Sequence, residues 1–356
     1  MRHKLFQVAL LQVGLIFSPL CQANDVLAED RQLPYVFGQG LRLGNYYLSG
    51  YTSIEFEDQF NKPAKLSLDD LSFFIGGRVG RWFNPFTEVE LARHTLIKQG
   101  GNPGHGNITV ERFYNDALVS DRDTLRIGKM LTPLGDWNTV FASPLVPTIT
   151  RPDTTALGFE TNESGINWMH DLQDGETVDT QLYWQPGNEW FKRLPRETLR
   201  NFQNVFGGHI NKPFGLIDKF GLSFQHGRLV ETGESYWAFG MNVMKSIGDL
   251  TLQSEAITSR FSGTALPGAL QRIHSGETGI FGLADYSITP KWYGIVEWEY
   301  YQDHLVGPAS RNTLFGIDFK PDPYIVWKLE YIHQQGVPTS FSPITTGMKC
   351  SFSALF

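Results

Sequence analysis

The sequence predicts an all-β fold, a single antiparallel transmembrane β-barrel of sixteen strands. Three observations carry this prediction. Apolar residues recur at every second position along most of the chain, which is typical of strands with one apolar and one polar face. The segments between candidate strands are alternately long and short, as in barrels whose long loops gather on one side of a membrane. The last candidate strand ends the chain at Phe356.

Composition excludes several other classes of protein. The 356 residues are 41% hydrophobic and 13% aromatic, which excludes a disordered chain. After the N-terminal stretch, no uninterrupted apolar run approaches the roughly 18–20 residues of a membrane-spanning helix. The formal net charge of −7 argues against a nucleic-acid partner, because such partners require clustered positive charge. A soluble all-β protein and a membrane barrel are both compatible with the mean hydropathy of −0.23.

The N-terminus has the features of an export signal. Basic residues at 2–4 precede an apolar stretch at 5–20, and small residues occupy the positions required for cleavage after Ala23. Cleavage there leaves Cys350 as the remaining cysteine, so we expect no internal disulfide. The chain therefore divides into a signal peptide at 1–23, an N-terminal segment at 24–45 and a β-barrel at 46–356. The N-terminal segment is left open between a short strand, a plug and a tail.

Alternation is clearest in the second half of the chain. Trp237, Phe239 and Met241 alternate with smaller or polar residues, and a turn from Ser246 to Asp249 leads into the next alternating run. The same pattern predicts sixteen strands near 46–57, 66–81, 86–94, 108–119, 124–129, 164–170, 178–185, 205–210, 220–227, 235–245, 250–259, 278–288, 292–301, 311–319, 324–333 and 347–356.

The connections and the strand ends support a membrane barrel. Every second connection is long, namely 58–65, 95–107, 130–163, 186–204, 260–277, 302–310 and 334–346, with a shorter one at 228–234. Most of the others are tight turns. A soluble sandwich or lectin-like fold, the main alternative, has no reason to sort its loops in this way. Aromatic residues gather at the short-turn ends, where an interfacial girdle belongs. The predicted girdle residues are Trp82, Tyr286, Trp292 and Tyr324.

The polar face of the strands is predicted to line a water-filled lumen. Sixteen strands is the size at which a barrel leaves an aqueous channel. Acidic residues predominate on this face, and we expect water around them because unpaired buried charges are costly. Charge pairing across strands in a closed lumen is the local alternative. The predicted pore-lining residues are Glu55, Arg78, Glu88, Glu90, Arg126, Glu255, Glu297, Glu299, Lys328 and Glu330.

The segment 130–163, which follows the fifth strand, is unusually long and rich in apolar residues. We expect it to fold into the barrel and constrict the lumen, with Phe141 packed against the wall. A loop that caps the barrel from outside and a contact between protomers are the alternatives. The predicted constriction residues are Asp136, Trp137, Arg151, Asp153 and Glu160.

Motifs for catalysis and metal binding are absent from the sequence. It contains no His-Glu-x-x-His, no Gly-x-Ser-x-Gly and no cysteine pair for a metal. The nine histidines are scattered, and we expect them at lumen or loop positions, including His209 and His226 on neighbouring strands. A barrel hydrolase would need a Ser/His pair on adjacent strands, and none is identified. We therefore predict no enzymatic activity, no cofactor and no metal site.

Two short segments carry a family resemblance. Leu-Arg-Ile-Gly-Lys at 125–129 continues into Thr-Pro-Leu-Gly at 132–135. This stretch resembles the strand-to-loop segment of porins in the phosphate-selective porin O/P group, and Leu-Arg-Leu-Gly at 41–44 resembles their first strand. The resemblance implies diffusion of small solutes through a bacterial outer membrane, commonly by a trimer. Phosphate-selective members line the pore with Arg and Lys, so the acidic lumen predicted here argues against phosphate selectivity.

Together these features predict a Gram-negative outer-membrane porin, exported through the periplasm, that passes small hydrophilic solutes or ions. Acidic walls repel anions, so we expect a preference for cations or neutral solutes. The expected partners are outer-membrane lipid and lipopolysaccharide, small solutes, further copies in a homotrimer, and the barrel assembly machinery. The terminal Phe356 resembles the assembly signal that this machinery reads. The alternatives are a non-conducting barrel that serves as anchor, sheath or surface receptor for a partner protein, and a barrel-embedded lipid hydrolase.

Overall fold

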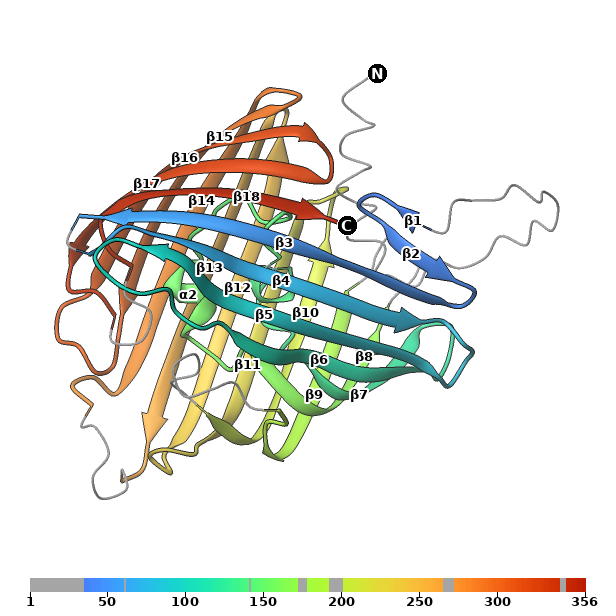
Figure 1. Ribbon diagram of the computed structural model, residues 1–356. Helices are drawn as coiled ribbons and strands as arrows, with labels where there is room; N and C mark the ends of the chain where they lie inside the picture. Colours follow the sequence, from blue (N-terminus) through green and yellow to red (C-terminus); the bar gives the residue numbers. More distant parts are fainter. Residues whose placement is uncertain are drawn as a thin grey trace.

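Sixteen long antiparallel strands form a closed barrel in the computed structural model (Figure 1), which describes residues 35–60, 62–140, 142–171, 178–191, 201–264, 272–339 and 344–356. The strands are β3 (Tyr46–Gln59), β4 (Lys65–Gly77), β5 (Asn84–Lys98), β6 (Asn107–Leu118), β7 (Asp123–Leu131), β8 (Asn162–His170), β9 (Asp179–Asn188), β10 (Phe202–Pro213), β11 (Lys219–Leu229), β12 (Ser235–Ile247), β13 (Leu250–Ser262), β14 (Gly276–Thr289), β15 (Trp292–Gln302), β16 (Ser310–Asp322), β17 (Ile325–Gly336) and β18 (Gly347–Leu355). The predicted sixteen-stranded barrel is confirmed. The expected signal peptide at 1–23 and Phe141 lie outside the described residues.

The observed strand boundaries differ most from the predicted ones where a strand continues through polar residues beyond its alternating part. β10 begins at Phe202 and ends at Pro213, whereas alternation predicted 205–210. Its polar end pairs on both sides, because Asn211 lies opposite Gly221 of β11 and Asp179 of β9. Backbone pairing does not depend on side-chain polarity, so strands continue past the residues that reveal them in the sequence.

The barrel closes between its last and first long strands. β18 pairs with β3 from Gly347 opposite Gln59 to Leu355 opposite Tyr51. Gly50 and Phe356 extend this seam by exchanging two backbone hydrogen bonds, both of 2.9 Å. The ring of Phe356 lies 5.7 Å from the ring of Phe73. A Cβ atom at Gly50 would lie 2.8 Å from the ring of Phe356.

Part of the N-terminal segment forms a small hairpin beside the barrel. β1 (Tyr35–Val36) pairs with β2 (Gly40–Leu43), and β2 pairs with the start of β3, where Leu41 lies opposite Leu48. Gly38 and Gly40 take positive φ angles of 78° and 87° in the turn, a conformation that glycine adopts without strain. The segment 24–45 was expected to form a short strand, a plug or a tail, and its described residues form short strands.

Most loop lengths follow the predicted asymmetry, but 171–178 at the short-turn end is longer than 60–64 and 230–234 at the long-loop end. The long-loop end carries the connections 60–64, 99–106, 132–161, 189–201, 230–234, 263–275, 303–309 and 337–346. The short-turn end carries 78–83, 119–122, 171–178, 214–218, 248–249, 290–291 and 323–324. The connection at 60–64 is shorter than expected because β3 continues to Gln59, where it still pairs with β18.

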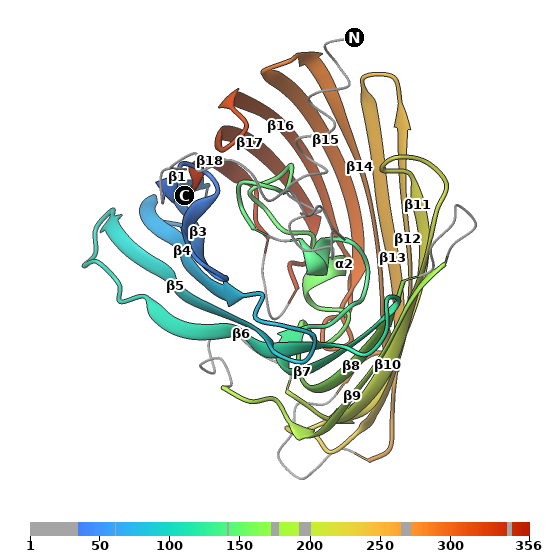
Figure 2. The same cartoon turned by 90° about the vertical axis from the view of Figure 1, so that its right-hand side faces the viewer.

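The longest connection, residues 132–161, folds inside the barrel, and we call it the inner loop. It contains the short helices η1 (Trp137–Thr139) and α2 (Asp153–Ala156). Figure 2, which looks into one end of the barrel, shows α2 within the ring of strands. The inward fold expected for this segment is thus confirmed. Among the described residues, no helix has both the length and the apolar content to span a membrane.

The inner face of the wall is less polar than the sequence predicted. Outward residues such as Trp237 and Phe239 are 40% and 55% exposed, as expected for a lipid-facing side. Other apolar residues face inwards and form buried clusters with residues of the inner loop. One cluster is built by Tyr51, Phe74, Phe86, Tyr114, Met130 and Leu355. These positions are apolar because they contact protein rather than lumen water.

We predict that Gly50→Ala weakens the closing seam. A Cβ atom at this position would lie 2.0 Å from the carbonyl oxygen of Ser72, so either β4 or the terminal Phe356 must move. The expected loss is about 1–3 kcal/mol of folding free energy, measurable by chemical denaturation in detergent micelles. Gly282→Ala is the matched control, because nothing lies within 4 Å of the added atom. Equal stability of the two variants would contradict this role of Gly50.

Candidate functional site

The first contact of the inner loop with the wall is made at Glu255 on β13. Its Oε1 accepts hydrogen bonds from the backbone N–H groups of Asp136 and Trp137, both at 2.9 Å. Gly135 allows this approach, because its φ is +65° and a Cβ atom there would lie 2.1 Å from Glu255 Oε2. The Trp137 ring meets Phe281 of β14 edge to face at 5.8 Å, and Phe281 is the register partner of Glu255.

The second contact is made by α2 on β15. Glu299 Oε1 accepts from the backbone N–H of Thr154 at 2.7 Å and from its hydroxyl at 2.9 Å. Glu299 Oε2 accepts from the side-chain amide of Asn312 at 3.0 Å, which fixes the carboxylate from the neighbouring strand. A Cβ atom at Gly279 would lie 2.7 Å from the Thr154 hydroxyl, so glycine on β14 makes room for the helix.

The third contact lies on β17, where two oppositely charged residues bind the loop backbone. The carboxylate of Glu330 accepts from the N–H groups of Ile149 and Thr150. The ammonium group of Lys328 donates to the carbonyl oxygens of Ser143, Val146 and Thr148, at 2.7, 2.6 and 3.3 Å. An irregular segment cannot pair its own backbone as a strand does, so these side chains satisfy groups that would otherwise be buried without partners.

The inner loop also contacts β4, β9 and β11. The Ser143 hydroxyl donates to Asp70 of β4 at 2.9 Å. The backbone N–H of Glu160 donates to Gln225 of β11 at 3.2 Å, and Gln185 of β9 donates to the Glu160 carboxylate at 3.1 Å. The loop therefore crosses the lumen instead of lying along a single wall.

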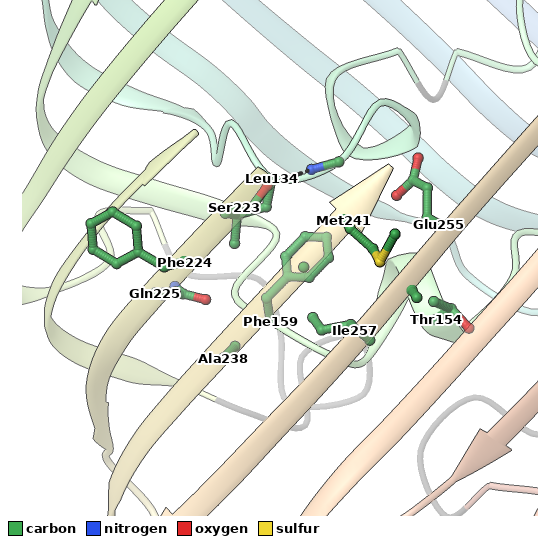
Figure 3. Close-up of a pocket in the computed structure, with 13 residues that line it drawn as sticks. Leu134, Thr154, Phe159, Ser223, Phe224, Gln225, Ala238, Met241, Glu255 and Ile257 are labelled. Carbon is green, nitrogen blue, oxygen red and sulfur yellow. Dashed lines mark hydrogen bonds between the residues drawn. The ribbon is translucent and has the colours of Figure 1, made fainter. Parts of the chain in front are cut away.

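A small cavity remains between the inner loop and strands β11 to β13 (Figure 3). It is lined by Leu134 and Phe159 from the loop and by residues such as Ser223 and Ile257 from the wall. Its volume of about 20 Å³ is enough for about one water molecule. The loop thus fits this part of the wall closely.

A serine and a histidine meet at this contact. His209 of β10 is the register partner of Ser223 of β11, and His209 Nδ1 lies 2.8 Å from the Ser223 hydroxyl oxygen. The sequence analysis identified no such pair. Alternation alone does not fix the register between two strands, so the two residues could not be matched in advance. The backbone N–H of Gly135 lies 3.4 Å from the Ser223 hydroxyl, and both side chains are buried.

Charge pairs between neighbouring strands occupy the wall on the other side of the barrel. Arg126 binds both carboxylate oxygens of Asp116 at 2.8 and 2.9 Å, and its guanidinium lies 3.9 Å above the ring of Tyr114. Glu55 of β3 is paired with Lys349 of β18 at 2.8 Å. A further pair joins Glu88 to Arg112. The alternative of cross-strand pairing is therefore found on these strands.

Arg112 was missed because β6 carries a bulge. Glu88 lies opposite Arg112 whereas Val89 lies opposite Val110, so Glu111 is an extra residue in the strand. After a bulge the alternation changes sides, and counting by twos assigns the wrong face.

The predicted pore-lining residues have four different surroundings. Glu255, Glu299, Lys328 and Glu330 hold the inner loop. Glu55, Glu88 and Arg126 form cross-strand pairs. Glu90 and Glu297 are buried in the wall, and Arg78 is exposed at the short-turn end. That these ten residues set the field in a pore stays a prediction.

The predicted constriction residues all lie in the inner loop. Asp136 forms an ion pair with Lys219 at 2.7 Å, and Arg151 binds the loop itself through Asn138 and Thr155. Trp137, Asp153 and Glu160 are buried, at 3%, 0% and 5% exposure. Asp153 accepts a hydrogen bond from Thr339 at 3.2 Å.

The four predicted girdle residues lie at the short-turn end, and their place at a membrane interface stays a prediction. Trp82, Tyr286 and Trp292 are 62%, 51% and 42% exposed near the short-turn end. Tyr324 is half-buried, because its ring lies 6.0 Å from the ring of Phe37 and packs against the buried cluster that contains Tyr51 and Phe74. The sequence could not show this, since the hairpin that covers Tyr324 lies far away in the chain.

Comparison with known proteins supports the fold. No protein-family model matches the chain, and no curated protein matches it. Among solved structures, the trimer form of OmpT, an outer membrane protein of Vibrio cholerae, has a TM-score of 0.58 and 11% identity, covering 87% of this chain and 98% of that one. The outer membrane channel DcaP of Acinetobacter baumannii gives 0.57 and 10%, covering 89% and 99%. The anion-selective porin from Comamonas acidovorans gives 0.57 and 11%, covering 87% and 99%. At these identities the likeness establishes a shared barrel fold, and the resemblance to the phosphate-selective group stays a prediction.

We predict that Gly135→Ala releases the start of the inner loop. The added methyl group would displace the Glu255 carboxylate and with it two hydrogen bonds to the loop backbone. Gly248→Ala is the control, because Gly248 has a similar φ of +62° but nothing lies within 4 Å of the new atom. Chemical denaturation should show that Gly135→Ala costs about 1–3 kcal/mol more than the control. Equal losses would mean that the contact with Glu255 does not stabilise the loop.

We also predict that docking of the loop depends on pH. Burial raises the pKa of Asp153 well above its ordinary value, and the charge of Glu299 adds to this effect. Burial raises the pKa of Glu160 in the same way, with the charge of Glu189 adding to it. The docked loop therefore binds protons more tightly than a displaced one. Its stabilisation is complete below the ordinary carboxyl pKa of about 4 and is lost as pH rises through the raised values.

The check is the thermal midpoint at pH 5 and at pH 8. The wild type should lose more stability over this interval than a variant carrying both Asp153→Asn and Glu160→Gln. An identical loss in both proteins would show that neither carboxyl group titrates with loop docking.

Proposed function

We propose that this chain is an outer-membrane porin through which small hydrophilic solutes or ions diffuse, narrowed by the inner loop. The observation that carries the proposal is a closed barrel of sixteen strands with a long connection bound inside it. Barrels of this size leave room for an aqueous channel. A bacterial outer membrane is the location this fold fits, with lipid and lipopolysaccharide around the outward aromatic residues. OmpT, a neighbour with the same fold, has been solved as a trimer, which supports a homotrimer here.

The proposed selectivity is for cations or neutral solutes. Acidic side chains predominate among the inward charges of β13 to β17, and a negative field raises the local concentration of cations. A neighbour with the same fold is an anion-selective porin, so the fold does not determine the sign of selectivity. Phosphate selectivity is not part of this proposal.

A non-conducting barrel is the second candidate, and one observation favours it. The inner loop contacts β4 and β17, which are separated by β18 and β3, and it also contacts β11 on the opposite part of the ring. A loop that crosses the lumen could close it, and the barrel would then serve as an anchor, sheath or receptor. Absence of conductance in planar bilayers, together with a co-purifying partner protein, would favour this candidate.

A lipid hydrolase is the third candidate, on the strength of the contact between Ser223 and His209. A cavity of about 340 Å³ is lined by both His209 and Ser223, so space alone does not argue against a substrate. A hydrolase would also need a carboxylate to orient His209 as a general base, and no carboxylate among the described residues is hydrogen-bonded to it. We therefore propose no enzymatic activity. Hydrolysis of phospholipid that is lost in Ser223→Ala would overturn this part of the proposal.

Variants of two residues on β15, Glu297 and Glu299, test the proposed constriction and the proposed selectivity separately. Glu299→Ala removes the acceptor for Thr154 and should raise single-channel conductance, because α2 is released. Glu297→Ala is the matched control, since Glu297 is likewise buried and its Oε2 has no hydrogen-bond partner among the described residues. This variant should keep the wild-type conductance and shift the reversal potential toward anions.

The measurement is single-channel recording in planar bilayers with a KCl gradient. The wild type should give a reversal potential of cation sign. An anion sign in the wild type would contradict the proposed selectivity. Unchanged conductance in Glu299→Ala would contradict the proposed constriction.

A further inference from the structure

A separate group of buried ionisable side chains lies at the long-loop end of the barrel. Glu277 stands at the start of β14, and Asp303 and His304 directly follow β15. All three are buried, at 1%, 2% and 7% exposure. One potential ligand atom from each lies within 4.8 Å of the others, and no other such group occurs in the part of the chain that the structure describes.

The geometry turns the imidazole toward both carboxylates. His304 Nδ1 lies 2.5 Å from Glu277 Oε1 and 3.5 Å from Asp303 Oδ1. The Tyr301 hydroxyl donates to Glu277 Oε2 at 2.7 Å and so holds the carboxylate from its other side. The ring of His304 packs on Phe261 at 4.5 Å, which fixes its plane.

A fourth side chain, Asp153 of the inner loop, lies near this group, because its neighbour Thr154 and the ring of Tyr301 both lie 2.7 Å from the position of a Cβ atom at Gly279. It is fully buried, and its Oδ1 has no hydrogen-bond partner among the described residues, whereas Oδ2 accepts from Thr339. The negative charges of Asp303 and Glu277 act on it strongly enough to help burial raise its pKa. A buried carboxylate oxygen without a donor is costly, and a metal ion would supply the missing partner.

We propose that Glu277, Asp303 and His304 bind a divalent transition-metal ion, with Asp153 as a further ligand. One imidazole nitrogen with several carboxylate oxygens is a donor set that suits Zn²⁺ and Mn²⁺. Ligand atoms that share an ion at about 2.0–2.2 Å lie roughly 3–3.5 Å apart. The two distances from His304 Nδ1 bracket this value, so binding requires only small movements of the side chains.

Such an ion would connect the inner loop to the wall. Asp153 is the first residue of α2, while Glu277 belongs to β14. The bound ion would replace repulsion between these carboxylates by attraction to a common charge. We therefore expect metal binding to stabilise the docked form of the inner loop, independently of whether the barrel conducts.

The test is calorimetric titration of ZnCl₂ into the full chain, refolded in detergent micelles and first treated with EDTA. The wild type should bind about one equivalent saturably, and its thermal midpoint should rise on binding. Glu277→Gln, Asp303→Asn and His304→Asn should each weaken binding at least tenfold. Asp153→Asn should weaken it at least threefold.

His333→Asn, a change at an exposed histidine on β17, is the control and should bind as the wild type does. Mobility on unheated gels checks that each variant is folded. Absence of saturable Zn²⁺ binding by the wild type, or wild-type affinity in His304→Asn, would overturn the proposal. The contact between His304 and Glu277 would then be an ion pair without a metal site. Wild-type affinity in Asp153→Asn would remove the inner loop from the site.

Discussion

Backbone hydrogen bonding of the inner loop is the constraint on which the rest of the structure depends. A buried N–H or C=O group without a partner costs about 1–3 kcal/mol, and an irregular segment inside a barrel has many of them. Carboxylates at Glu255, Glu299 and Glu330 accept from the loop N–H groups. Lys328 donates to its carbonyl groups. The wall is thus built to complement one particular path of the loop.

This constraint gives the inward charges a second role. An acid that accepts hydrogen bonds from the loop fixes the loop position as well as contributing to the field. Arg126 and Glu55 are engaged in cross-strand pairs and contribute less net charge than their number suggests. The net charge that faces the lumen is therefore smaller than the composition indicates, and it depends on where the loop lies.

The strands could be predicted because apolar and polar residues alternate along each of them, and this pattern is visible in the local sequence. The ends of β10 could not be predicted, since pairing continues through polar residues that show no alternation. Inward folding of the long loop could be expected from its apolar residues, but the partners of Glu299 and Glu330 could not. Those contacts join residues 145 and 181 positions apart, and no local pattern encodes them.

Other features of the structure could not be predicted because they depend on contacts between distant parts of the chain. The bulge at Glu111 changes the side on which Arg112 lies, and alternation cannot reveal it. His209 meets Ser223 through a register that depends on the neighbouring strands. Tyr324 packs against Phe37 of the N-terminal hairpin, and this contact is not encoded in the residues around Tyr324.

Amide hydrogen exchange, resolved by residue in detergent micelles, tests the docked loop most directly. The N–H groups of Asp136, Trp137, Ile149, Thr150 and Thr154 all donate to wall carboxylates. They should exchange slowly, at rates approaching those of strand amides. Exchange of these five amides at the rate of an exposed loop would contradict the docking on which this description of the lumen rests.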